Sequence, residues 1–306
     1  MRVFVTGGTG LIGSRLIRAL TARGDRVVLL TRRPEAAVDI GAVCDVVTGD
    51  PTQPGAWQDA ITGCDAVINL AGASIIGQRW SADYKRVIRD SRVKSTDHCA
   101  VSLAKNPQRG DGSPKVLLSA SAIGYYGPHG DEELDESATP GNDFLAGLCI
   151  DWEKAAQPAL DADVRVVFSR TGVVLDPAGG PLKKLLLPFK LCLGGPVASG
   201  KQYMSWVHHA DVTGLLLFAL DRASARGPMN VTAPDPRTNK EFGKALGNAL
   251  GRPAIFWTPE FMLKLALGQG AEIITSGQRV LPKRAVEWGY QFRFPKLELA
   301  LADILK

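Results

Sequence analysis

The chain has 306 residues, enough for one large domain or two modest ones, and its composition is that of an ordinary globular protein. Its formal net charge is +5, but the lysines and arginines are scattered, which argues against a nucleic-acid-binding surface. The five cysteines form no C-x-x-C pair, so we expect reduced thiols and neither a metal site nor a disulfide framework. No apolar stretch is long enough to span a bilayer and no signal peptide precedes the first strand, so we expect a cytoplasmic protein with no membrane partner.

The N-terminal segment reads as a strand, a glycine-rich turn, a helix and a second strand. The strands are expected at residues 2–6 and 26–31, and residues 11–23 have the apolar periodicity of an amphipathic helix. The turn fits both G-x-G-x-x-G and G-x-x-G-x-x-G, through Gly7, Gly8, Gly10 and Gly13. This arrangement predicts a dinucleotide-binding βαβ unit.

The chemistry of a pyrophosphate explains the glycines. The chain must turn sharply from strand to helix, and the phosphates must approach the backbone at a helix N-terminus, where free N–H groups favour an anion. The residues expected to contact the pyrophosphate are Gly7, Gly10, Leu11, Ile12 and Gly13. The alternative, a glycine-rich turn without a ligand, is disfavoured by the strand and helix on either side.

The end of the second strand indicates which dinucleotide binds. NAD-binding units usually place Asp or Glu about 20 residues past the glycines, whereas NADP-binding units use arginine for the 2′-phosphate. Here Thr31 is followed by Arg32 and Arg33, with no carboxylate before Glu35. Because a guanidinium can hold a phosphate with two hydrogen bonds, we predict NADP(H), with Arg32 as the main contact. The alternative is that both arginines are solvated loop residues.

The first half continues to alternate strands and helices, which predicts an α/β protein with a Rossmann-type, doubly wound parallel sheet. Strands are expected at residues 43–47, 66–70, 115–119 and 164–170, and helices at residues 81–105 and 142–160. We expect residues 1–175 to form the dinucleotide-binding domain.

The second half is richer in Pro and Gly. A helix at residues 211–220 and a strand at residues 229–231 return to the sheet, so residues 205–232 are assigned to the first domain. We expect residues 176–204, which include a basic, leucine-rich helix at 182–193, and residues 233–306 to form a smaller, mostly helical C-terminal substrate lobe.

Several motifs together carry a family resemblance. They are TGGTGLIG at 6–13, NLAGA at 69–73, the tract 79–92, SASAIGYYG at 119–127, RTGVVL at 170–175, SWVH at 205–208 and SGQRVLP at 276–282. Over essentially its whole length the chain resembles the extended branch of the short-chain dehydrogenase/reductase superfamily. It is most similar to an atypical group of epimerase-family proteins of uncertain activity. This group resembles nucleoside-diphosphate-sugar epimerases and carries a C-terminal domain of unknown function.

The resemblance implies the remaining cofactor contacts. It places Asp50 near the adenine, Leu70, Ala71 and Gly72 along the adenosine ribose and pyrophosphate, and Ser119 and Ser121 beneath the nicotinamide. Independently, ligands of open α/β sheets bind at the carboxyl ends of the strands, which also places Ser121 near the chemistry.

The helix after these serines departs from the family pattern. Standard members carry Tyr-x-x-x-Lys, in which the tyrosine exchanges a proton with the substrate and the lysine lowers the tyrosine pKa and binds the ribose. Here Leu145 or Phe144 falls at the tyrosine position and Cys149 or Leu148 at the lysine position. Because apolar side chains cannot move a proton, we predict that the usual dyad is absent. Lys154 does not restore it, since it lies about 140° around the helix from Cys149.

Other side chains are candidates for the chemistry. We expect Ser121 to hydrogen-bond the substrate, with Tyr126 or Tyr125 as the proton donor, the alternative for the tyrosines being a packing role. The histidine pair at residues 208–209 has a suitable pKa, but the resemblance implies a structural entry to a helix. Cys149 is interpreted as a buried thiol rather than a nucleophile. The acidic run at residues 131–136 is interpreted as solvated surface rather than a metal site.

Two functions fit these observations. The first is an NADP(H)-dependent oxidoreductase or nucleotide-sugar-epimerase-like enzyme, acting on a nucleotide sugar or another small anionic carbonyl or hydroxyl compound. Candidate contacts to such a ligand are Arg79, Trp80, Lys201, Trp206 and Arg279, each of which has an ordinary structural alternative. The second, motivated by the missing dyad, is a non-catalytic NADP(H)-binding regulator or sensor. A monomer and a homodimer are both compatible with the sequence.

Overall fold

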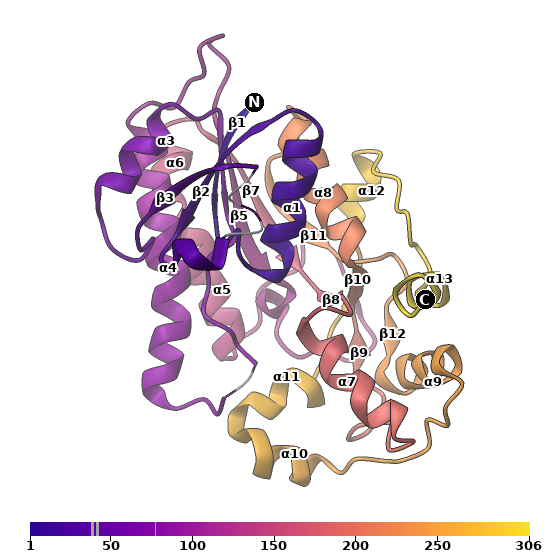
Figure 1. Cartoon of the computed structure of the whole chain (residues 1–306). Coiled ribbons are helices and arrows are strands. Elements are labelled where there is room, and N and C mark those ends of the chain that lie inside the picture. The colour runs from indigo at the N-terminus through magenta and orange to yellow at the C-terminus, as the bar shows by residue number, and fades with distance from the viewer. Residues whose placement is uncertain (38–39, 41–42, 77) are drawn as a thin grey trace.

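The computed structural model describes residues 1–37, 40, 43–76 and 78–306. Seven parallel strands form the main sheet in the order β11-β7-β5-β4-β1-β2-β3 (Figure 1). These are β1 (Arg2–Thr6), β2 (Arg26–Thr31), β3 (Asp45–Thr48), β4 (Ala66–Asn69), β5 (Val116–Ala122), β7 (Arg165–Thr171) and β11 (Gly227–Val231). The strand order runs in opposite directions on the two sides of β1, which confirms the predicted doubly wound Rossmann-type sheet.

Helices cover both faces of this sheet. One face packs against α1 (Leu11–Ala22) and α8 (His209–Asp221). The other packs against α3 (Asp59–Thr62), α4 (Ala82–Ala104) and α6 (Gln157–Asp161). Because the central strands are covered on both sides, their sequences are continuously apolar rather than alternating. Short 3-10 turns, η1 (Pro34–Ala37), η2 (Ala56–Gln58) and η3 (Ile123–Tyr126), connect the elements.

The single helix predicted at residues 142–160 is wrong. It is divided into α5 (Phe144–Lys154) and α6 (Gln157–Asp161). Pro158 occupies the first turn of α6, where its missing N–H is tolerated, but it could not continue the hydrogen-bond ladder of α5. The break lets α5 contact η3 while α6 packs against α4.

The C-terminal region is mostly helical, as predicted. Its helices are α7 (Gly180–Lys190), α9 (Asn239–Leu250), α10 (Glu260–Leu267), α11 (Glu272–Thr275), α12 (Lys283–Glu287) and α13 (Leu297–Ile304), with the 3-10 turn η4 (Gly268–Ala271). A second hydrophobic core joins α7, α9 and α13 and includes the buried Trp206, Phe242 and Leu301.

In the part of the chain that the structure describes, three small two-stranded sheets, which were not predicted from the sequence, join distant segments. They pair β8 (Val173–Leu175) with β10 (Trp206–His208), β9 (Tyr203–Met204) with β12 (Arg237–Thr238), and β6 (Glu133–Leu134) with β13 (Arg279–Val280). Each strand has two or three residues, too short for a period-two pattern to be recognised.

Residues 131–133 of the acidic run are exposed, as predicted, but the prediction of a solvated surface is wrong for Glu136. The Glu136 carboxylate is only 5% exposed and accepts hydrogen bonds from the backbone amides of Asn230, at 2.9 Å, and Arg284. Burial raises the pKa of Glu136, although these amides oppose the shift. Glu133 and Asp135 also form ion pairs with side chains of the C-terminal region. The run therefore attaches the end of the chain to the rest of the molecule.

A second buried carboxylate does the same on α8. Asp211 is fully buried and accepts hydrogen bonds from the backbone amides of Arg293 and Phe294, both at 2.9 Å, and from the Tyr290 hydroxyl at 3.0 Å. A buried carboxylate without such donors would be strongly destabilising. Asp211 thus fixes the segment between α12 and α13 against the sheet.

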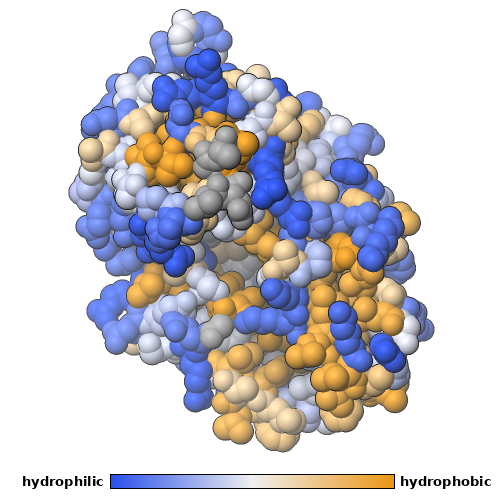
Figure 2. Space-filling view, in the orientation of Figure 1, coloured by the Kyte–Doolittle hydropathy of each residue, from blue (hydrophilic) through white to orange (hydrophobic). Residues whose placement is uncertain are grey.

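The C-terminal region also presents an apolar surface. Hydrophobic residues gather at the lower end of the molecule in Figure 2, where Figure 1 places α7 and α10. Leu187, Leu191, Phe261 and Leu265 are each at least 60% exposed there. Within the part of the chain that the structure describes, no helix is both long and apolar enough to cross a membrane.

Candidate cofactor and active site

The glycine turn after β1 is packed too tightly for any other residue at two positions. Gly7 has φ +66°, and a Cβ there would lie 2.6 Å from the Leu70 carbonyl. A Cβ on Gly13 would lie 2.4 Å from the Gly7 oxygen and 2.6 Å from the Gly8 Cα. Both glycines are therefore required for the start of α1 to approach the carboxyl ends of β1 and β4.

The N-terminus of α1 has the properties of a phosphate site. Gly10 is its N-cap and provides no side chain, and the first turn contains no acidic residue. The amides of Leu11, Ile12 and Gly13 therefore form the positively polarised end of the helix, and no side-chain oxygen caps them. The residues present fit a pyrophosphate at this position.

The residues that follow β2 and β3 lie together at the same edge. The Gly49 amide donates to the Thr31 carbonyl at 3.0 Å, which brings Asp50 beside the end of β2. Asp50 accepts hydrogen bonds from the amide and hydroxyl of Thr52, at 2.9 and 2.8 Å. Arg32 and Arg33 are exposed, and no described carboxylate lies within ion-pair distance of either. Both guanidinium groups are therefore accessible to a phosphate.

Two buried polar side chains shape the segment after β4. The Ala71 amide donates to Thr6 Oγ1 at 3.2 Å, and the Thr6 hydroxyl in turn donates to Asn69 Oδ1. Asn69 is fully buried and donates to Thr96 Oγ1 on α4 at 2.8 Å. Thr6 and Asn69 therefore position residues 70–72, a role that the sequence reasoning missed. The available signal was a polar residue closing an otherwise apolar, buried strand.

The two serines of β5 have different surroundings. Ser119 is fully buried, and its hydroxyl faces the Ala120 carbonyl at 3.3 Å. Ser121 is 4% exposed, and its hydroxyl donates to Glu153 Oε1 at 2.7 Å. Because the Ser121 proton is held by Glu153, its oxygen is left as a hydrogen-bond acceptor.

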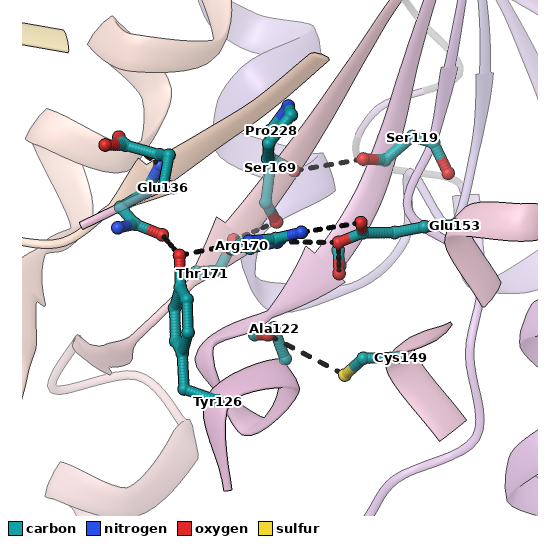
Figure 3. A network of polar contacts seen from close by, with 12 residues as sticks. Ser119, Ala122, Tyr126, Glu136, Cys149, Glu153, Ser169, Arg170, Thr171 and Pro228 are labelled. Atoms are coloured by element: carbon teal, nitrogen blue, oxygen red, sulfur yellow. Dashed lines mark hydrogen bonds and ion pairs between the residues drawn. The ribbon is translucent and has the colours of Figure 1, made fainter. Parts of the chain in front are cut away.

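A buried ion pair with Arg170 holds the Glu153 carboxylate that accepts the Ser121 proton. Arg170 donates from Nε and Nη2 to the two carboxylate oxygens of Glu153, at 2.8 and 2.9 Å (Figure 3). Burial opposes the charge on Arg170, but the hydrogen bonds to Glu153 outweigh it and raise the pKa of Arg170 above its ordinary value. Arg170 also donates from Nη1 to the Tyr126 hydroxyl at 3.1 Å, and that hydroxyl donates to Asn230 at 2.7 Å. The sequence reasoning did not identify this network.

The two tyrosines are therefore not equivalent. Tyr126 is fully buried, its hydroxyl is engaged in this network, and burial raises its pKa to about 12. This placement argues against the prediction of Tyr126 as a proton donor. Tyr125 is only half-buried, and the guanidinium of Arg170 lies 3.4 Å from its ring centroid. Of the two, Tyr125 stays the candidate acid.

The residues predicted to stand at the tyrosine and lysine positions of the usual dyad are packed against the end of β5 and η3. Leu145 lies against Gly124, whose Cβ, if present, would be 3.2 Å from that of Leu145. The Cys149 thiol faces the Ala122 carbonyl at 3.7 Å, as drawn in Figure 3. Burial raises the pKa of Cys149 to about 12, so the thiol is neutral at physiological pH and a poor nucleophile.

His208 has a structural role. Its Nδ1 accepts the Ala210 amide at 3.1 Å and so caps the N-terminus of α8. Burial, followed by the neighbouring His209, lowers the pKa of His208 to about 4. The imidazole is therefore neutral at physiological pH and is already used as a helix cap.

Most of the other side chains predicted to contact the substrate already have partners within the protein. Trp80 and Trp206 are buried and donate their indole N–H groups to backbone carbonyls, and Arg279 is ion-paired. Arg79 and Lys201 are exposed. In the described residues, no group of three or more His, Cys, Asp or Glu side chains could hold a metal ion.

Three features define a dinucleotide-binding Rossmann protein. They are the switch in strand order at β1, the N-terminus of α1 without a side-chain cap, and the arginines after β2. Residues 3–146 match the NAD dependent epimerase/dehydratase family, and residues 258–304 match a domain of unknown function, DUF1731. The chain is 38% identical over 314 residues to the epimerase family protein SDR39U1 of Bos taurus, with 100% of both chains covered. It therefore belongs to the NAD-dependent epimerase/dehydratase family, in the group of SDR39U1 epimerase family proteins.

Solved structures agree with this assignment. The human epimerase family protein SDR39U1 (isoform 2), solved with NADPH, is 36% identical and superimposes with a TM-score of 0.87 over 99% of both chains. A nucleoside-diphosphate sugar epimerase from Corynebacterium glutamicum is 32% identical with a TM-score of 0.79. That match covers 100% of this chain and 58% of the other.

Proposed function

We propose that the chain binds NADP(H) across the carboxyl edge of the sheet. The pyrophosphate lies at the N-terminus of α1, and the 2′-phosphate lies at Arg32. The observation that carries this proposal is the combination of an uncapped helix N-terminus with exposed arginines in place of a carboxylate after β2. The NADPH in the 36% identical human structure supports the same cofactor.

Removing the Arg32 guanidinium tests the cofactor assignment. We expect Arg32→Ala to weaken NADPH binding about ten- to a hundredfold, because charge-assisted hydrogen bonds to the 2′-phosphate are lost. Binding of NADH, which lacks that phosphate, is expected to change less than about twofold. Calorimetric titration of each cofactor gives both affinities. Arg18→Ala, which removes an equal charge from an exposed position on α1, is the matched control. Equal losses for both cofactors would contradict the assignment.

We further propose an oxidoreductase or epimerase-like activity on a small anionic compound with a hydroxyl or carbonyl group, such as a nucleotide sugar. When bound, the cofactor supplies or accepts hydride at C4 of its nicotinamide. Ser121 accepts a hydrogen bond from the substrate hydroxyl, since its own proton is held by Glu153. Tyr125 exchanges the proton. The name of the 32% identical Corynebacterium protein supports a nucleotide-sugar substrate.

Loss of turnover in two variants tests this activity. With NADP(H) and a panel of nucleotide sugars and small carbonyl compounds, we expect Tyr125→Phe to lower kcat about 10²–10⁴-fold, the range of a general acid. Ser121→Ala is expected to raise KM and lower kcat together, since the lost acceptor positions the substrate. NADPH affinity serves as the control and is expected to stay within about twofold in both variants.

The second candidate function is a non-catalytic NADP(H)-binding regulator or sensor. The packing roles of Leu145 and Cys149 and the hydrogen-bonded hydroxyl of Tyr126 favour it, because none of these three side chains offers a free proton. It predicts tight NADPH binding with no turnover in the wild-type protein. A wild-type rate above that of Tyr125→Phe would rule it out.

A further inference from the structure

Arg92, which projects from α4, lies against the segment that follows β4. A Cβ placed on Gly72 would be 3.1 Å from the Arg92 Cζ and 3.3 Å from its Nη2. The guanidinium therefore packs directly on the Gly72 backbone. Leu70, two residues before Gly72, contacts Gly7 of the phosphate turn. Arg92 thus reaches the candidate cofactor site from the side opposite β2.

The guanidinium is fixed by the protein but is not neutralised by it. Its Nη1 donates to the Ile88 carbonyl at 2.9 Å, and its Cζ lies 5.1 Å from the Trp152 ring centroid. Burial lowers the pKa of Arg92, yet an arginine remains charged at physiological pH. Among residues 1–37, 40, 43–76 and 78–306, no carboxylate lies within 4.0 Å of it and none accepts a hydrogen bond from its Nε or Nη2.

This differs from two other arginines near the site, the buried Arg170 and the partly exposed Arg15. Arg170 is paired with Glu153, and Arg15 donates to both carboxylate oxygens of Asp176 at 2.6 and 2.9 Å. A shielded cation without a counter-charge is costly unless oxygen acceptors surround it. The buried Arg165 has three such acceptors, the carbonyls of Ala219, Leu220 and Ala225, whereas Arg92 has the Ile88 carbonyl. The free donors of Arg92 therefore indicate a ligand at Gly72.

The location of Arg92 also corresponds to the missing lysine. Cys149 or Leu148 is predicted at the lysine position on α5, and the charge of Arg92 acts on the Cys149 thiol. Trp152, under the guanidinium, is one turn further along α5. The guanidinium of Arg92, from α4, thus lies near the place where a lysine on α5 would put its positive charge.

We propose that Arg92 binds the nicotinamide half of NADP(H) through Nε and Nη2, donating to its ribose hydroxyls and the adjoining phosphate. The inference rests on the proposed function. A cofactor whose 2′-phosphate lies at the end of β2 and whose pyrophosphate lies at α1 continues past β1 towards β4. The resemblance places Gly72 along the adenosine ribose and pyrophosphate, but Arg92 extends from Gly72 to Trp152 and Cys149 of α5. The helix α5 follows the serines expected beneath the nicotinamide, so the free donors of Arg92 are assigned to the nicotinamide side. Arg92 in this way takes over the ribose-binding part of the lysine's role from another helix.

Two ligands separate this contact from the adenosine end. Adenosine 2′,5′-bisphosphate carries the 2′-phosphate but lacks the nicotinamide half. We expect Arg92→Ala to weaken NADPH about ten- to a hundredfold and the bisphosphate less than about twofold, by calorimetry without substrate. Arg32→Ala is expected to weaken both ligands. Arg89→Ala is the matched control, since Arg89 lies one turn earlier on α4, is exposed and pairs with Asp151. It is expected to change neither.

Unaltered bisphosphate binding by Arg92→Ala also reports that the variant is folded. Arg92→Lys, which keeps a cation, is expected to recover part of the NADPH affinity. Wild-type NADPH affinity in Arg92→Ala, or an equal loss for both ligands, would overturn the role of Arg92 while leaving the proposed function intact. Failure of the wild-type protein to bind NADPH would instead overturn the proposed function, and this inference with it.

Discussion

Replacing Glu153 by alanine is expected to lower the free energy of unfolding by about 3–5 kcal/mol, because the buried charge of Arg170 loses its counter-charge. Arg170 is 3% exposed and has both of its ion-pair hydrogen bonds directed at Glu153. Ser121 loses the acceptor for its proton at the same time. Urea denaturation at neutral pH, compared with the wild-type protein, measures the change.

Asp151→Ala provides the matched control for this prediction. Asp151 is on the same helix and also pairs with an arginine, Arg89, but the two side chains are 41% and 47% exposed. Exposed pairs contribute about 0–1 kcal/mol, so the control is expected to lose no more than that. Similar losses of unfolding free energy in the two variants would show that the buried Arg170–Glu153 pair stabilises the protein no more than an exposed pair does.

Gly13→Ala is expected to destabilise the protein by about 1–3 kcal/mol and to weaken NADPH binding at least about tenfold. The added methyl group would meet the backbone of Gly7 and Gly8, which cannot rotate away as a side chain can. The start of α1 must therefore move from the phosphate turn, and the amides that face the pyrophosphate move with it. Thermal denaturation and calorimetric titration give the two effects separately.

The control for this variant is Gly147→Ala. Gly147 lies in the interior of α5, is exposed, and a Cβ there would meet no other atom within 4 Å. Alanine at such a position is expected to stabilise the helix by about 0.5–1 kcal/mol and to leave NADPH binding unchanged. An equally well-tolerated Gly13→Ala would show that the turn has room that the structure does not indicate.

The sequence alone predicted the fold because its signals are local. The strand, glycine turn and helix at residues 2–22 follow one another directly, and each has a pattern that can be read within a short window. The predicted NADP(H) agrees with the cofactor named for the human relative. The Arg32 and Arg33 assignment used the same kind of local signal, two cations at the end of a strand, and stays a prediction.

The polar network around Ser121 could not be predicted in this way. Its hydrogen bonds join residues that are far apart in sequence, such as Tyr126 and Asn230, which are separated by 104 positions. Nothing near Glu153 in the sequence distinguishes it from a solvated helix residue, and its partner Arg170 lies in the strand β7. Arg92 was missed for the same reason, since its significance depends on Gly72 lying beside it.

The carboxylates of Glu136 and Asp211 have a consequence for synthesis on the ribosome. Both are buried in the finished protein, yet Arg284, Arg293 and Phe294, whose amides bond to them, are made after every strand of the main sheet. A nascent chain that ends before β13 therefore contains all seven strands of the main sheet but leaves two carboxylates without these amide donors. Because these contacts come from a segment that is made after the whole main sheet, the native state becomes accessible only once residue 294 has left the ribosome.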